Sequence, residues 1–130
     1  MKQTKKSQII IPAGTHPWSH ELRVANILAL AGHTVEFLPT GAQKTADILL
    51  DEVEYEIKSP KTNNTNSLEH LLKKALGQSP NIIIDTSRMK NAKGYKIRHF
   101  LLAQAKSRKR IKRLLLVTKR GEIVDISSLT

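Results

Sequence analysis

The chain has 130 residues, of which 39% are hydrophobic and 4% aromatic, and it contains no cysteine. This length suits a single domain, 1–130, with one modest core and a flexible basic start at residues 1–8. Without thiolates, a bound metal would take oxygen or imidazole ligands, which favours Mg²⁺ or Mn²⁺ and leaves Zn²⁺ as an alternative. The apolar runs are too short for a membrane span, and the N-terminus lacks the pattern of a signal peptide.

Positive charge dominates the composition. There are 22 Lys and Arg against 11 Asp and Glu, a net charge of +11, and residues 86–120 contain thirteen basic residues and no acidic one. Such a surface suits a phosphate backbone, whose binding releases counterions. A surface made basic for solubility and an anionic membrane are the alternatives, but the tract 106–113 offers only Ile111 as an apolar residue. The residues expected to contact nucleic acid are Lys61, Arg88, Lys90, Lys106, Arg108, Lys109 and Arg110.

The first half of the chain predicts one helix followed by three strands. Residues 9–11 could form a short edge strand, and a helix follows with Ser19 as its N-cap, Trp18 packed against it as a staple and Gly32 as its end. Residues 34–38 form a strand after it. The segments 46–50 and 53–59 then form a hairpin around an Asp-Glu pair.

The second half alternates helices and strands. Asn66 and Glu69 resemble a capping box at the start of a second helix, which Gly77 ends. Residues 81–85 are a continuous apolar run, as expected of a buried strand. A third helix is expected at 92–108, and 114–118 pairs with 123–126. These elements predict a mixed-sheet α/β domain in the order α-β-β-β-α-β-α-β, with parallel crossovers in its second half.

The hairpin carries the candidate chemistry. Alternation along the second strand puts Glu56 and Lys58 on one face. A two-residue turn at 51–52 makes Asp47 the direct cross-strand neighbour of Glu56, with Cβ atoms about 5 Å apart. Two carboxylates so placed repel each other unless a cation lies between them, and the Lys58 ammonium beside them could neutralise charge on a phosphate. Asp-Glu is not a preferred pair for this turn, and a longer turn would shift the register.

Simpler roles exist for each of these residues. An alternating Glu-x-Glu-x-Lys strand is also typical of the solvated face of an antiparallel sheet. Glu21, in the first turn of the first helix, could act as a third metal ligand or simply interact with the helix dipole. Asp85 could lie at the site edge of the sheet, with Arg88 and Lys90 beside it, or cap the following turn. No catalytic part is expected for His16, His20 or His33.

Glu21, the Thr45-Ala46-Asp47 segment and the Glu56-Ile57-Lys58 segment together resemble the PD-(D/E)xK nuclease superfamily, which has the restriction-endonuclease-like fold; Ala46 stands where the motif has proline. With Ser59-Pro60-Lys61 and Asn81-Ile82-Ile83-Ile84-Asp85 added, the chain is similar to the C-terminal tRNase domains of contact-dependent growth inhibition toxins.

The resemblance implies a divalent-metal endonuclease that cleaves tRNA in the cytoplasm of a competing bacterium. Such a domain is delivered from a larger secreted protein and neutralised in the producer by a cognate immunity protein. The superfamily's metal ligands correspond to Asp47, Glu56 and Glu21, and its catalytic lysine to Lys58. Two other functions fit the same residues: a DNA nuclease of this superfamily, such as a resolvase or restriction-like enzyme, and a non-catalytic RNA-binding module.

Overall fold

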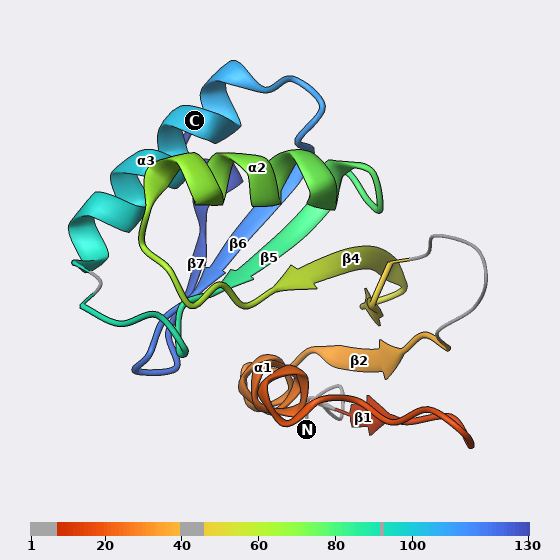
Figure 1. Ribbon diagram of the computed structural model, residues 1–130. Coiled ribbons are helices and arrows are strands. Elements are labelled where there is room, and N and C mark those ends of the chain that lie inside the picture. Colours follow the sequence, from red (N-terminus) through yellow and green to blue (C-terminus); the bar gives the residue numbers. More distant parts are fainter. Residues whose placement is uncertain (1–7, 40–45, 92) are drawn as a thin grey trace, which may run out of the picture.

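The computed structural model describes residues 8–39, 46–91 and 93–130. These residues form a curled seven-stranded sheet with three α-helices and a short 3₁₀ helix (Figure 1). In chain order the elements are β1 (Gln8–Ile10), α1 (Ser19–Leu30), β2 (Thr34–Phe37), β3 (Ile48–Leu50), β4 (Val53–Lys58), α2 (Thr65–Leu76), β5 (Asn81–Asp85), α3 (Gly94–Ser107), β6 (Arg113–Val117), β7 (Ile123–Asp125) and the 3₁₀ helix η1 (Ile126–Leu129). No helix in the described part of the chain combines the length and hydropathy needed to cross a membrane.

The strand order in the sheet follows the order of the strands in the chain. Strands β4, β5 and β6 run parallel, joined by crossovers that contain α2 and α3, whereas β2, β3 and β4 are antiparallel neighbours. The mixed α/β fold and its parallel second half are therefore confirmed. The predicted order left out the outermost strands, β1 and β7, although segments 9–11 and 123–126 were expected to be extended; the structure makes both of them strands of the sheet.

The sheet carries one hydrophobic cluster on each face. Helix α1 packs with Tyr55 and Ile57 of β4 and with Ile83 of β5. Helices α2 and α3 pack on the other face, against the side chains of Ile82 and Ile84 of β5. Figure 1 shows α2 and α3 on one side of β5 to β7, and α1 on the other side near β1 and β2. Side chains along β4 and β5 therefore alternate between an α1 face and an α2–α3 face.

The start of α1 lies one residue earlier than predicted. Trp18 is the N-cap and Ser19 the first helical residue. The reason is Glu21, whose Oε1 accepts a hydrogen bond of 2.8 Å from the Trp18 backbone N–H. Trp18 is 71% exposed, and its ring lies parallel to that of His20 at 6.4 Å. The predicted staple is therefore wrong.

Helix α2 also begins away from its predicted N-cap. Asn64, not Asn66, caps α2, because its side-chain oxygen accepts hydrogen bonds from the backbone N–H groups of Asn66 and Ser67. Gly77 ends α2 as predicted. Helix α3 begins at Gly94; the predicted start at residue 92 lies outside the described residues, as do residues 1–7 of the expected basic start.

The hairpin turn has the two-residue geometry that the catalytic hypothesis requires. Asp51 and Glu52 have φ values of 48° and 71°, the left-handed pair found in tight hairpins. The Asp51 carboxylate holds the turn in place: its Oδ1 accepts from the Thr34 N–H at 2.9 Å, and its Oδ2 lies 2.6 Å from Nδ1 of His33. These contacts stabilise a turn that the Asp-Glu pair alone would disfavour. The predicted register, with Leu50 opposite Val53, is confirmed.

Candidate active site

Asp47 lies one residue before β3 and is tied to both neighbouring strands. Its backbone N–H donates to the Tyr55 carbonyl at 3.0 Å, and its carbonyl accepts from the Leu38 N–H at 2.9 Å. Its side-chain Oδ2 accepts from the Ile57 N–H at 2.8 Å. The Asp47 carboxylate thus accepts the hydrogen bond that a backbone carbonyl of a neighbouring strand would otherwise accept. This bond holds the carboxylate next to Glu56.

Glu56 is a carboxyl group with little access to water. It is 4% exposed, and its Oε2 lies 3.1 Å from Nζ of Lys58. Its Oε1 is buried and has no hydrogen-bond partner among the described residues. Burial, and then the negative charge of Asp47, raise the pKa of Glu56 from 4.5 to about 7, against the opposing effect of Lys58. At neutral pH this carboxyl is poised between its protonated and ionised forms.

Glu56 and Lys58 share one face of the sheet, and the Asp47 carboxylate lies close to Glu56. Glu56 and Lys58 pair with Ile82 and Ile84, which face α2 and α3, whereas the intervening Ile57 faces α1. Lys58 follows at the end of β4, where its side chain is 29% exposed. The juxtaposition of the two carboxylates and the ammonium group predicted from the alternation is therefore present. Their catalytic roles stay predictions.

Glu21 is not part of this group. Its carboxylate accepts the Trp18 N–H at the start of α1, the helix that packs with Ile57 on the other face of the sheet. Within the described residues, no three His, Asp or Glu side chains lie close enough together to hold a metal ion. The placement fits the helix-start alternative, and a metal-ligand role for Glu21 remains a prediction.

Asp85 is fully buried on the α1 face and bonded on all sides. Its Oδ1 accepts from Nη1 of Arg23 at 3.2 Å, and its Oδ2 accepts from the hydroxyls of Ser59 and Ser87, each at 2.9 Å. Arg23 also donates to the carbonyls of Thr118 and Lys119. Asp85 and Arg23 together join α1 to the ends of β4, β5 and β6. No sequence signal pairs Arg23 with a residue 62 positions away.

Comparison with known proteins adds the family. The profile described as "Contact-dependent growth inhibition CdiA C-terminal domain" matches residues 44–123, more than half of the chain. The chain belongs to this family. The matched region includes Asp47, Glu56 and Lys58 and excludes Glu21. Comparison with curated proteins gives no significant match.

The fold of this CdiA C-terminal domain is similar to that of one solved structure. It is described as "CdiA-CT/CdiI toxin and immunity complex from Burkholderia pseudomallei". The similarity covers 91% of this chain and 97% of that one, with a TM-score of 0.66 and 16% sequence identity. At this identity the likeness is one of architecture.

The basic residues expected to contact nucleic acid lie at two opposite edges of the sheet in this CdiA C-terminal domain. Lys61, Arg88 and Lys90 are exposed and follow β4 and β5, at the edge where Lys58 lies. The tract 106–113 lies at the other edge, because the N–H groups of its last two residues donate to the carbonyl of Pro80, just before β5. Five strand residues separate the edges by roughly 17 Å.

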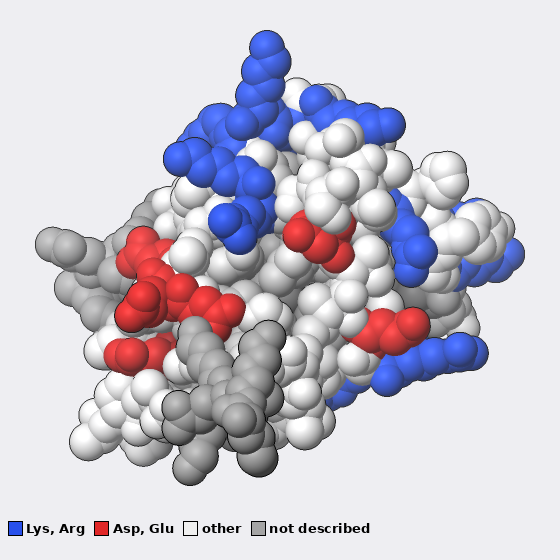
Figure 2. All heavy atoms as spheres, turned by 180° about the vertical axis from the view of Figure 1, so that it is seen from behind, with Lys and Arg blue, Asp and Glu red and all other residues white. Residues whose placement is uncertain are grey.

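Two arginines of the distant tract are engaged within the fold. Arg108 donates to Oε1 of Gln104 at 2.6 Å and lies 3.5 Å from Oε1 of Glu69. Arg110 donates to the carbonyl of Leu76 at 3.4 Å. In Figure 2, Lys and Arg side chains gather at the top and on the right of the molecule, while the largest group of Asp and Glu lies apart on the left. The separation of charges leaves basic surface at both edges.

Proposed function

We propose that this domain is a metal-dependent nuclease of the PD-(D/E)xK superfamily that acts as a toxin by hydrolysing phosphodiester bonds in tRNA. The observation that carries the proposal is the buried Glu56 carboxyl, set beside Asp47 and Lys58 with one oxygen unsatisfied. A buried carboxylate oxygen without a donor calls for an explanation, and a bound cation would supply one. Membership of a toxin-domain family supports the same reading.

The carboxylate pair fits a divalent cation. Without one, ionising both carboxyls at neutral pH is unfavourable, because burial and the charge of Asp47 raise the pKa of Glu56 to about 7. Asp47 and Glu56 would hold the ion, and their oxygen ligands suit Mg²⁺ or Mn²⁺. When bound, such an ion lowers the pKa of a coordinated water and neutralises charge on the phosphate.

The protein groups supply positioning and charge. The Ile57 N–H fixes the Asp47 carboxylate. Lys58, partly exposed and 3.1 Å from Glu56, favours the ionised carboxylate and is placed to stabilise the negative charge that develops on the phosphate. Binding of the ion would displace the proton that Glu56 can hold in the free protein, because a carboxyl that ligates a metal must be ionised.

A protein inhibitor and delivery into another cell complete the proposal. The similar solved structure is a toxin and immunity complex, so we infer a cognate immunity protein for this chain. A net charge of +11 favours a partner with an acidic face. As a C-terminal toxin domain, the chain would be delivered from a larger protein into the cytoplasm of a target bacterium.

Digestion of total tRNA and plasmid DNA, with Mg²⁺ or with EDTA, tests the proposal. We expect Mg²⁺-dependent cleavage of tRNA, abolished by Glu56→Gln. Glu54→Gln is the matched control, because Glu54 is exposed and lies on the same face of β4. Cleavage of DNA in place of tRNA would identify a DNA nuclease. Salt-dependent binding of RNA without cleavage under any metal would identify a non-catalytic module.

A further inference from the structure

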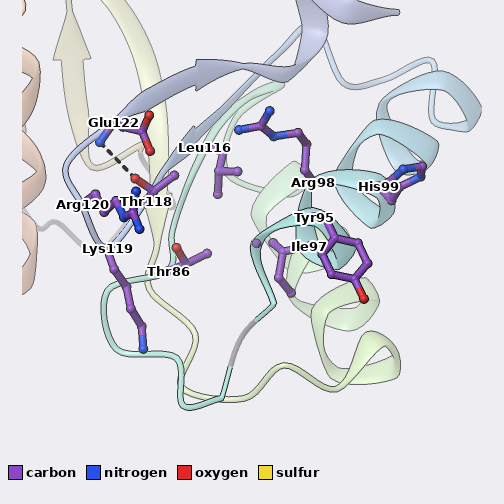
Figure 3. A pocket seen from close by; sticks show the side chains of 11 residues that line it. Thr86, Tyr95, Ile97, Arg98, His99, Leu116, Thr118, Lys119, Arg120 and Glu122 are labelled. Atoms are coloured by element: carbon purple, nitrogen blue, oxygen red, sulfur yellow. Dashed lines mark hydrogen bonds between the residues drawn. The ribbon is translucent and has the colours of Figure 1, made fainter.

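A pocket of about 670 Å³ lies between the start of α3 and the turn that joins β6 to β7. Its volume falls in the range of small-ligand sites. Figure 3 shows Thr86 and Thr118 on one side of the space, and Tyr95, Ile97 and Arg98 of α3 on the other. We call this the α3 pocket; its lining is completed by Gly94, His99, Leu116, Lys119, Arg120 and Glu122.

The α3 pocket opens on the same sheet face as the candidate active site. Lys58 pairs with Ile84 of β5, and Thr86 lies two residues further along the same face. Strand geometry puts the Cα atoms of Lys58 and Thr86 roughly 8 Å apart. A nucleic-acid strand, which advances about 3.4 Å per stacked nucleotide, would span that separation in roughly two nucleotides.

The lining combines uncommitted cations with an exposed aromatic ring. Arg98, Lys119 and Arg120 are exposed, and their side chains form no hydrogen bond or ion pair with the described residues, in contrast to Arg23. Their three positive charges face one carboxylate, that of Glu122. Tyr95 is 63% exposed in a chain with few aromatic residues. The pocket thus has an exposed ring on its α3 side and cations on both sides, groups that can stack on a base and neutralise its phosphates.

We propose that the α3 pocket binds a nucleotide of an unpaired segment of the nucleic-acid substrate, next to the phosphate that is cleaved. Tyr95 stacks on the base, and Arg98, Lys119 and Arg120 contact the phosphates on either side. A paired base cannot reach the ring, so the pocket selects single-stranded loops and ends. This inference rests on the proposed nuclease function for its substrate, but binding in the pocket can be measured without cleavage.

The charge arm of the test uses the full chain with Glu56→Gln as background, so that the probe survives. Fluorescence anisotropy with a labelled single-stranded RNA oligonucleotide compares Arg98→Ala/Lys119→Ala with Lys74→Ala/Lys112→Ala, whose two exposed lysines lie away from the pocket. We expect the pocket pair to weaken binding at least tenfold and to flatten the salt slope by about 1.4. Equal losses in the two pairs would overturn the inference.

The stacking arm uses Tyr95. Leu in its place keeps an apolar side chain without a ring, and Phe keeps the ring without the hydroxyl. We expect Tyr95→Leu to weaken oligonucleotide binding by about fivefold to a hundredfold, and Tyr95→Phe to bind like the background protein. A duplex of the same sequence should not distinguish the two variants. Indistinguishable affinities of the Leu and Phe variants for the single strand would refute stacking.

The experiments distinguish failure of the nuclease proposal from failure of the α3-pocket proposal. Pocket-dependent oligonucleotide binding by a protein that cleaves no nucleic acid would leave the α3 pocket in place and remove the nuclease. Conversely, cleavage that Glu56→Gln abolishes, combined with pocket variants that bind like the Lys74→Ala/Lys112→Ala control, would keep the nuclease and remove the pocket.

Discussion

Glu56→Gln removes a carboxyl group that ionises less readily in the folded protein than in the unfolded chain. At high pH the variant should therefore be more stable than the wild type. The folded state holds the Glu56 proton more tightly than the unfolded chain, since its pKa is about 7 instead of 4.5. The unfolding free energy is therefore highest below pH 4.5 and falls as the pH rises through about 7. The full loss is on the order of 3 kcal/mol, of which about 2 to 3 kcal/mol falls between pH 5 and pH 8.

Urea unfolding at a series of pH values measures this difference. Far-UV circular dichroism is the suitable signal, because Trp18 is 71% exposed and its fluorescence would change little on unfolding. We expect the wild type to lose about 2 to 3 kcal/mol more than Glu56→Gln between pH 5 and pH 8, roughly a 10 °C difference in Tm at pH 8. Glu54→Gln should follow the wild type.

Parallel curves for the wild type and Glu56→Gln would refute the reasoning. They would mean that Glu56 ionises as easily in the folded protein as in the unfolded chain, and hence that neither its burial nor Asp47 holds a proton there. A steeper loss in Glu56→Gln than in the wild type would contradict the sign.

Three further predictions concern the surroundings of the site. Arg23→Ala should lower the unfolding free energy by about 2 kcal/mol in urea, because it leaves the buried Asp85 carboxylate without its cation; an unchanged midpoint would contradict this. Glu52→Gly should raise the free energy of unfolding by about 0.5 to 1 kcal/mol, since glycine tolerates a φ of 71°. Asp51→Gly should lower it, because the carboxylate contacts with Thr34 and His33 are lost. The opposite ranking in thermal unfolding would refute the turn assignment. Mg²⁺ should raise the Tm of the wild type but not that of Glu56→Gln, and equal shifts would place the ion elsewhere.

The parts of the fold that could be predicted are those governed by local patterns. Alternation along β4 separates Glu56 and Lys58 from Ile57, and the two-residue turn sets the pairs from Leu50↔Val53 to Ile48↔Tyr55, which leaves Asp47 close to Glu56. The apolar run at 81–85 matches β5 residue for residue. In each case the deciding contacts lie within about ten residues of one another, so the period of the side chains determines them.

The parts that could not be predicted depend on contacts between distant segments. Nothing in the neighbourhood of Glu21 shows that α1 packs on the face opposite Glu56. The charge of the tract 106–113 is plain from the sequence, but its distance from Lys58 follows from the strand order. The starts of α1 and α2 also differ from the prediction. The Trp18 N–H donates to the Glu21 carboxylate, and the Asn66 N–H donates to the Asn64 side chain.

Cleavage of total tRNA in the presence of Mg²⁺ tests most directly whether the Asp47 and Glu56 carboxylates act together as a metal-dependent catalytic pair. Denaturing gels should show discrete tRNA fragments with the wild type and with Glu54→Gln. They should show intact tRNA with Asp47→Asn, with Glu56→Gln, and with the wild type in EDTA. Full cleavage by either of the two carboxylate variants would contradict the account.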